Sequence, residues 1–153
     1  MPTRRRYVLD TNIYIDAFRQ PQANVELIRF HEQAGPGEYL SSVVIQELRA
    51  GVQSTTALRR LERHVIDRYA SVGRILTPSA ASWSAAGDVF AALRARQGVD
   101  LWRMSKAFGN DVMLALSCRE AGFVLVTDNE RDFARIAEIA PFDYVMRWPD
   151  FGR

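Results

Sequence analysis

Residues 110–127, NDVMLALSCREAGFVLVT, decide the fold of this chain. They join an apolar helix, expected from about Asn110 to Ala121, to residues 123–127, the most apolar strand of the chain. Gly122 lies between them, and glycine commonly ends a helix. A continuous apolar strand beside a helix is typical of a parallel sheet that helices cover on both faces.

The same alternation of strand and helix extends outward from this stretch. Strands are expected at residues 6–9, 39–41, 74–77 and 144–146. Helices are expected after Asp10 and over residues 25–34, 42–51 with Ser42 as the cap, 54–71, 79–98 and 130–140. The apolar face of the 79–98 helix is predicted to hold Trp83, Ala86, Phe90 and Leu93. Repeated strand and helix order predicts the α/β class.

Length and composition favour one domain over residues 1–153, because 48% hydrophobic and 25% charged residues are typical of globular proteins. The single cysteine, Cys118, cannot form an internal disulfide, so a cytoplasmic location is expected. No apolar run approaches the roughly 20 residues that span a bilayer, so no membrane partner is expected. A net charge of +2 permits a nucleic-acid partner without requiring one.

Acidic residues stand at positions that favour a shared site. Asp10 and Asp128 each follow a predicted strand, and in a parallel sheet ligands bind at the carboxyl ends of the strands. Glu47 and Asp111 lie near the starts of helices beside stripes that should be buried. Because buried carboxylates repel one another, a shared cation is a natural way to keep them ionised. Oxygen ligands favour Mg²⁺ or Mn²⁺.

Each acid also has an ordinary structural interpretation. Asp10 can cap a helix, and Asp111 can answer the dipole at a helix start. Glu47 can pair with Arg49 or Arg119. Asp128, Glu130 and Asp132 lie in a polar turn, where acids are common. The residues taken singly therefore leave the metal site open.

The order of the motifs is more specific than any one of them. Residues 8–16 (VLDTNIYID), 41–51 (SSVVIQELRAG), 109–127 (GNDVMLALSCREAGFVLVT) and 126–136 (VTDNERDFARI) follow one another over most of the chain. This series resembles that of the PIN-domain nucleases, and within them the VapC-type toxins. The resemblance implies a doubly wound domain with a central, mainly parallel sheet of about four or five strands. It also implies an endoribonuclease dependent on Mg²⁺ or Mn²⁺.

The family's site residues carry over to this sequence position by position. The acids that hold the metal correspond to Asp10, Glu47 and Asp111, and side chains that orient the site correspond to Thr11, Asn12 and Thr127. A fourth acid often follows the turn threonine by two residues, where this chain has Asn129. The fourth place is therefore open between Asp128, which we include among the candidate catalytic residues, Asn129 and Asp132.

The expected chemistry is hydrolysis of an RNA phosphodiester. A metal-bound water of lowered pKa would attack the phosphorus, a second ion would stabilise the leaving 3′-oxygen, and the products would carry 5′-phosphates. Trp102, Arg103 and Lys106 are the candidate RNA contacts nearest in sequence to Asp111. The resemblance implies a small antitoxin partner and a homodimer, for which the apolar faces of residues 25–30 and 58–69 are candidate surfaces, with core packing as the alternative.

Competing functions have less support. A phosphoacceptor signalling domain needs a lysine at a strand end, whereas the only lysine, Lys106, precedes a helix. His31 and His64 are expected on helix surfaces, and Cys118 in the core, which disfavours histidine or thiol catalysis. A PIN fold that only binds, or an RNA-processing nuclease without an antitoxin, stays open.

Overall fold

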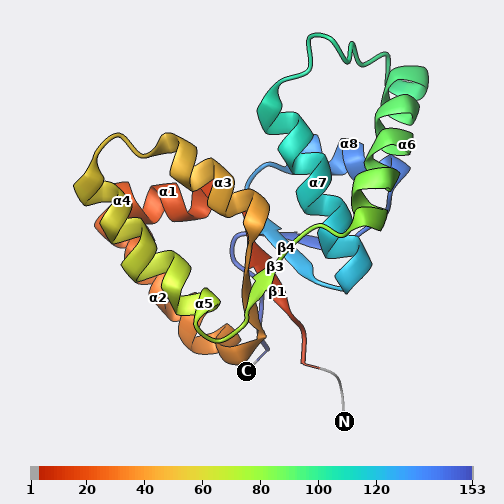
Figure 1. Ribbon diagram of the computed structural model, residues 1–153. Helices are drawn as coiled ribbons and strands as arrows, with labels where there is room; N and C mark the ends of the chain where they lie inside the picture. Colours follow the sequence, from red (N-terminus) through yellow and green to blue (C-terminus); the bar gives the residue numbers. More distant parts are fainter. Residues whose placement is uncertain (1–3, 153) are drawn as a thin grey trace.

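The structure is a computed structural model that describes residues 4–152, so residues 1–3 and 153 of the predicted domain lie outside it. Within this range five strands form one sheet in the order β3-β2-β1-β4-β5. Each neighbouring pair is parallel, which confirms the α/β class and the doubly wound sheet (Figure 1). The strands are β1 (Tyr7–Leu9), β2 (Glu38–Ser41), β3 (Ile75–Leu76), β4 (Val124–Thr127) and β5 (Tyr144–Met146).

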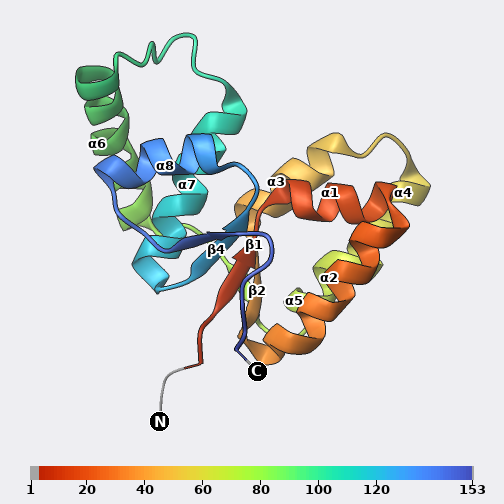
Figure 2. The same ribbon diagram turned by 180° about the vertical axis from the view of Figure 1, so that it is seen from behind.

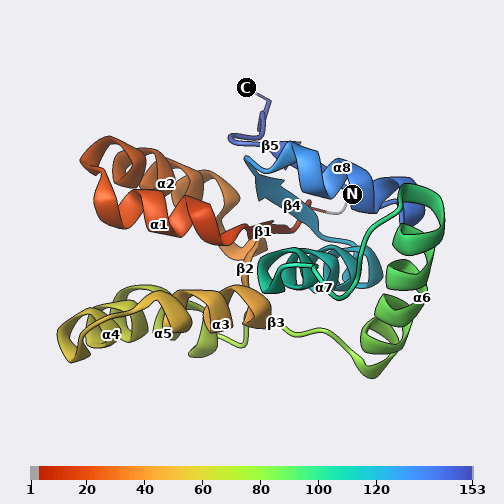
Figure 3. The same ribbon diagram turned by 90° about the horizontal axis from the view of Figure 1, so that it is seen from above.

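The helices form two groups on opposite sides of the strands, α1–α5 and α6–α8, as Figures 1 and 3 show. The first group contains α1 (Thr11–Arg19), α2 (Pro21–Ala34), α3 (Ser42–Gly51), α4 (Thr55–Leu61) and α5 (Asp67–Ala70). The second contains α6 (Ala80–Gln97), α7 (Lys106–Ala121) and α8 (Glu130–Ile139). A 3₁₀ turn, η1 (Gly35–Gly37), precedes β2, and a π turn, η2 (Glu62–Ile66), joins α4 to α5. Along residues 4–152, none of the helices combines the length and apolar character that crossing a membrane requires.

The sheet reverses its strand order between β1 and β4. From β1 the chain proceeds outward through β2 and β3, then returns to place β4 and β5 on the other side of β1. Leu9 pairs with Val126, and the amide of Asp10 donates to the Val126 carbonyl at 2.9 Å. Ligands of doubly wound sheets bind at such a reversal, next to the carboxyl ends of the strands.

The core is built on the stretch that decides the fold. All four residues of β4 are buried. Every residue of α7 from 111 to 118 is buried too, Cys118 among them, so this part of α7 is surrounded by protein. Burial of this order stabilises by roughly 25 cal/mol per Å² of apolar surface. Asp111 therefore belongs to the buried part of α7 that forms the core.

The last residues pack back onto the α1–α2 side of the molecule (Figure 2). The Trp148 ring stacks on Phe30 with centroids 5.2 Å apart, and its indole nitrogen donates to Glu26 at 3.2 Å. Phe151 packs against Tyr7 at 5.5 Å. These contacts fix the end of the chain close to β1 and bring Arg147 toward the carboxyl edge of the sheet.

Several local predictions were wrong. Helix α7 begins at Lys106 rather than Asn110, because the Ser105 hydroxyl caps it by accepting from the Phe108 amide at 3.1 Å. Ser41, not Ser42, caps α3. Trp83 is 63% exposed, since α6 buries the face that carries Ser82, Ala86, Val89 and Leu93. The predicted helix over 54–71 contains the π turn, which shifts its register partway.

Candidate active site

Asp10 links the first and fourth strands at the carboxyl edge of the sheet. It follows β1, precedes α1 and is 6% exposed. One carboxylate oxygen accepts from the Thr11 amide at 2.8 Å, and the other accepts from the Thr127 hydroxyl at 2.7 Å. Burial raises the pKa of Asp10, these hydrogen bonds oppose the rise, and the charges of Glu47 and Asp128 add to it. Asp10 caps α1 through one carboxylate oxygen, and its second oxygen accepts a hydrogen bond from Thr127 of β4.

The Glu47 side chain extends from α3 to the edge of the sheet where Asp10 lies. The Thr11 hydroxyl donates to a Glu47 carboxylate oxygen at 2.8 Å, so Thr11 connects Asp10 with Glu47 through its amide and its hydroxyl. Neither arginine considered from the sequence pairs with Glu47. Arg49 pairs with Glu62, and Arg119 donates to the Pro141 carbonyl. The half-buried setting of Glu47 is thus explained by the site and not by an ion pair.

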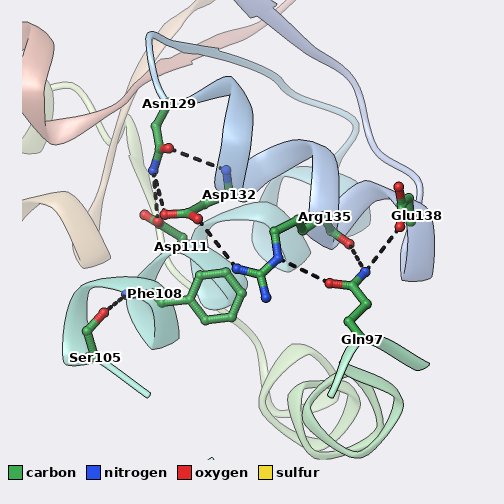
Figure 4. Close-up of polar contacts among 8 residues, drawn as sticks. All are labelled: Gln97, Ser105, Phe108, Asp111, Asn129, Asp132, Arg135 and Glu138. Carbon is green, nitrogen blue, oxygen red and sulfur yellow. Dashed lines mark hydrogen bonds and ion pairs between the residues drawn. The ribbon is translucent and has the colours of Figure 1, made fainter. Parts of the chain in front are cut away.

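The surroundings of Asp111 raise its pKa. It is 9% exposed, and the Asn129 amide nitrogen lies 3.3 Å from one of its oxygens (Figure 4). Burial, then the charges of Asp10, Glu47 and Asp132, raise the pKa of Asp111 to about 8. The three named carboxylates are therefore close enough to repel it.

Asn129 organises the turn between β4 and α8. Its backbone amide donates to the Thr127 hydroxyl at 3.0 Å, and its side-chain oxygen caps α8 by accepting from the Asp132 amide at 3.4 Å. Its side-chain nitrogen donates to both Asp111 and Asp132, at 3.3 and 3.2 Å. Asn129 thus joins the fourth strand to two of the acids.

Asp128 and Asp132, the two aspartates of this turn, have different partners. Asp132 lies beside Asp111, as described, whereas Asp128 is 49% exposed and pairs with Arg147. Arg147 also binds Asp16 of α1 at 2.7 Å. Asn12, predicted to orient the site, is exposed on α1, and none of the hydrogen bonds within residues 4–152 involves its side chain.

The carboxylates of Asp10, Glu47, Asp111 and Asp132 fit a hard divalent cation in their chemistry, since they supply only oxygen ligands. Across residues 4–152, no three carboxylate, imidazole or thiol side chains already converge as a finished metal site. Instead, Asp10, Glu47, Asp111 and Asp132 adjoin one another through Thr11, Thr127 and Asn129.

Comparison with known proteins identifies the family of this chain. The family model of the PIN domain matches residues 7–139, which include each acid described above. The chain belongs to the PIN-domain family. The tRNA(fMet)-specific endonuclease VapC of Shigella flexneri is 32% identical to this PIN-domain chain over 139 residues, which cover 91% of the chain and 98% of that protein. Ribonuclease VapC2 of Haemophilus influenzae is 30% identical over 141 residues, covering 92% and 98%.

Solved structures share the PIN fold at lower identity. DNA-bound VapBC from Salmonella typhimurium matches with a TM-score of 0.66 at 23% identity, covering 93% of this chain and 98% of that one. FitAcB from Neisseria gonorrhoeae matches with a TM-score of 0.64 at 19% identity, covering 90% and 95%. The fold and family expected from the motif series are confirmed.

Sequence reasoning missed two arginines around the PIN-domain site. Arg135 lies 3.8 Å from Asp132, one helical turn further along α8, and this spacing of three residues was a readable signal for an ion pair. Arg147 gave no such signal, because its partners Asp16 and Asp128 are distant in the sequence. His31, expected on a helix surface, is instead half-buried and lies 2.7 Å from the buried Glu38 carboxylate.

The predicted RNA contacts lie on the segment between α6 and α7. Trp102 is 99% exposed, Arg103 is exposed and pairs with Asp100 at 3.6 Å, and Lys106 is exposed at the first residue of α7. This segment is on the same side of the PIN domain as α7 and α8 (Figure 3).

Proposed function

We propose that this PIN-domain chain is a metal-dependent endoribonuclease that acts as the toxin of a toxin–antitoxin pair. The observation that carries the proposal is the gathering of Asp10, Glu47, Asp111 and Asp132 where the strand order reverses. Within residues 4–152, the contact of Arg135 with Asp132 is the one ion pair between an arginine and these four acids. A divalent cation is the ligand of complementary charge.

Each side chain has a distinct task in this proposal. Asp10, Glu47 and Asp111 would hold Mg²⁺ or Mn²⁺, and Asp132, to which the Asn129 side-chain nitrogen donates, would take the fourth place. Thr11 and Thr127 orient Glu47 and Asp10 by donating to them. A bound divalent cation supplies an activated water as the nucleophile toward the RNA phosphorus. Asp128 stays on the rim, where Arg147 holds it.

Protons compete with the cation for this site. Since the pKa of Asp111 is raised to about 8, this side chain carries a proton at neutral pH until a cation displaces it. Cation binding therefore releases a proton, and affinity rises with pH until Asp111 is ionised in the free protein.

An antitoxin partner is proposed from the relatives and from the α1–α5 side. VapBC and FitAB are solved as complexes, and the curated relatives are VapC ribonucleases. A cavity of about 420 Å³, lined in part by Glu47, is formed by α1, α3 and α4 and includes the apolar side chains of Phe18, Leu48 and Leu61. Phe18 and Ile28 are 50% and 47% exposed. This surface suits an apolar antitoxin segment or the second copy in a homodimer.

The proposal includes a single domain over residues 1–153 and a cytoplasmic location. The free thiol of Cys118 is buried, and a protein with one unpaired cysteine suits a reducing compartment.

An RNA cleavage assay tests the activity. The protein and its Asp10→Asn and Asp111→Asn variants are incubated with transfer RNA in EDTA, Mg²⁺ or Mn²⁺, with Asp88→Asn, an exposed acid of α6, as the matched control. We expect cleavage only with metal, retained by the control and lost by both site variants. Cleavage in EDTA, or undiminished cleavage by both site variants, refutes the mechanism.

A growth assay tests the toxin role separately. Induced expression should arrest growth, and co-expression of the proposed antitoxin should restore it. Metal-dependent cleavage without growth arrest would instead indicate an RNA-processing nuclease. RNA binding without cleavage would indicate a binding module, the alternative that Asn129 in place of an acid favours.

A further inference from the structure

A second pocket lies between the α1–α2 pair of helices and the α4–α5 pair, which Figure 3 shows as separate layers. The volume of this pocket is about 400 Å³, within the range of small-molecule sites. Two arginines and two histidines line it, and no aspartate or glutamate of residues 4–152 does. The acids of the candidate active site are therefore not part of it. We call it the α2–α5 pocket.

Three of the basic side chains come from the helical segment of residues 55–70. Arg60, His64 and Arg68 follow one another at intervals of four residues, and all three line the pocket. Side chains at this spacing share one face of a helix. The π turn η2 lies in the middle of this row and includes His64. Because π turns are rare and occur frequently at functional sites, the row and the turn together indicate a ligand site.

These three side chains have no acidic partner in the part of the chain that the structure describes. None of the ion pairs among residues 4–152 involves Arg60, His64 or Arg68. Arg68 instead lies near the Tyr69 ring, with its guanidinium carbon 6.0 Å from the ring centre. Guanidinium groups on one wall repel each other, and a bound anion would offset this repulsion. The charge of the pocket therefore favours an anionic ligand.

A buried carboxylate fixes the floor of the pocket. Glu38 is 1% exposed, accepts from the Tyr69 hydroxyl at 2.5 Å, and lies 2.7 Å from Nδ1 of His31. His31 and Tyr69 both line the pocket. Since Nδ1 of His31 faces Glu38, the ring is held in one orientation. Its other nitrogen, Nε2, takes part in none of the hydrogen bonds of residues 4–152 and is available to a ligand.

Tyr14 adds an unused hydrogen-bond donor from α1. It lines the pocket and is 1% exposed. Along residues 4–152, its hydroxyl is the one buried side-chain polar atom without a hydrogen-bond partner. A buried hydroxyl that lacks a partner costs stability. An oxygen of a ligand at the floor of the pocket would supply the acceptor that this hydroxyl lacks.

We propose that the α2–α5 pocket binds a phosphate monoester of nucleotide size. A phosphate monoester carries close to two negative charges and three acceptor oxygens at neutral pH. It therefore matches two guanidinium groups with further histidine and hydroxyl donors better than a carboxylate does. Phe18 and Ile28 line the same pocket and are 50% and 47% exposed, so they offer apolar surface to the nucleoside. This inference goes beyond the proposed function and does not depend on RNA cleavage.

Isothermal titration calorimetry with adenosine monophosphate (AMP) tests the inference. The titration is done in EDTA, so that a cation at the acidic site cannot bind the phosphate. We expect saturable binding of AMP and no binding of adenosine. Arg68→Ala should weaken AMP binding roughly ten-fold or more, since a charge-assisted hydrogen bond is lost. The matched control is Arg63→Ala, an exposed arginine of the same π turn that does not line the pocket, and it should change the affinity less than about two-fold.

Tyr14→Phe separates an effect on binding from an effect on folding. Because the hydroxyl has no partner, its removal should leave the urea midpoint unchanged or higher, while AMP binding weakens roughly three-fold or more. A lower urea midpoint with unchanged AMP affinity would show that the hydroxyl serves the fold and would contradict its role in the pocket.

Three outcomes overturn the inference. They are the absence of AMP binding, equal binding of adenosine, and unchanged AMP affinity in both Arg68→Ala and Tyr14→Phe. A dinucleoside monophosphate, whose diester carries a single negative charge, should bind more weakly than AMP, and equal binding overturns the assignment of a monoester. Each of these results leaves the proposed nuclease function standing, because that function is tested separately by metal-dependent cleavage of RNA.

Discussion

Replacing Asp111 with asparagine should stabilise the metal-free protein while abolishing its response to metal. Asp111 is buried among acids, and its pKa rises from 3.8 to about 8 on folding. The folded chain thus holds a proton that the unfolded chain has released between these values. Linkage then requires the free energy of unfolding to fall as pH rises from about 4 to about 8. Asparagine keeps the shape and an acceptor oxygen for Asn129 but does not ionise.

The size of the effect follows from the shift. At pH 7 the difference between the unfolded pKa and the pH is just over three units, which corresponds to about 4 kcal/mol at 1.36 kcal/mol per unit. Water entry and small movements of Asp10, Glu47 and Asp132 reduce this, so we expect a gain of about 2 kcal/mol for Asp111→Asn in EDTA. The variant should show a flatter dependence of stability on pH between 4 and 8.

Urea unfolding at several pH values, in EDTA and in Mn²⁺, measures both effects. Mn²⁺ should stabilise the wild type, since a ligand that binds only the folded state adds free energy, and should leave Asp111→Asn unchanged. Asp88→Asn, exposed on α6, should behave as the wild type throughout. A variant no more stable than the wild type in EDTA at pH 7, or a wild type indifferent to Mn²⁺, would refute the reasoning.

Three further substitutions test neighbouring contacts. Thr11→Val removes the hydroxyl that donates to Glu47 and should lower the apparent Mn²⁺ affinity in cleavage assays by roughly 10–100-fold, with Thr11→Ser close to wild type. Asn129→Asp adds a carboxylate beside Asp111, so calorimetry should show tighter Mn²⁺ binding and urea unfolding a less stable protein in EDTA; weaker Mn²⁺ binding would contradict this role. Glu38→Gln leaves a neutral acceptor for the Tyr69 hydroxyl, now at 2.5 Å, and should reduce the free energy of unfolding by about 1–3 kcal/mol without changing the activity of the folded protein.

The sequence predicted the parts of the fold that local pattern controls. Residues 123–126 are apolar without interruption because both faces of β4 are buried, and Gly122 ends α7 in a left-handed conformation, with φ of 71°. The position of Trp83 was not predictable in this way. Helix α6 carries alanine and serine on every side, so its pattern does not mark which face α7 and α8 cover. The start of α7 was missed because Ser105 caps a turn that has little apolar periodicity.

The residues of the site also divide into those that a local pattern predicts and those that only packing determines. Asp10, Glu47 and Asp111 could be singled out because an acid beside an apolar stripe is visible in one segment of sequence. Glu38 was missed although it is buried, since its partners His31 and Tyr69 come from α2 and α5. Arg147 was missed for the same reason. Contacts between elements distant in the chain are set by packing and leave no local pattern.

The turn after β4 explains why Asp132 joins the site and Asp128 does not. Asp128 precedes the helix cap, where the chain is still extended from the strand, and it points to Arg147 on the last segment. Asp132 follows the cap by three residues, so its amide binds the Asn129 oxygen and its carboxylate receives the Asn129 nitrogen. An aspartate at 129 would cap the helix equally well, but it would have no N–H for Asp111 or Asp132. The asparagine therefore joins the two acids through hydrogen bonds from its side-chain nitrogen, and Asp132 supplies the carboxylate that position 129 lacks.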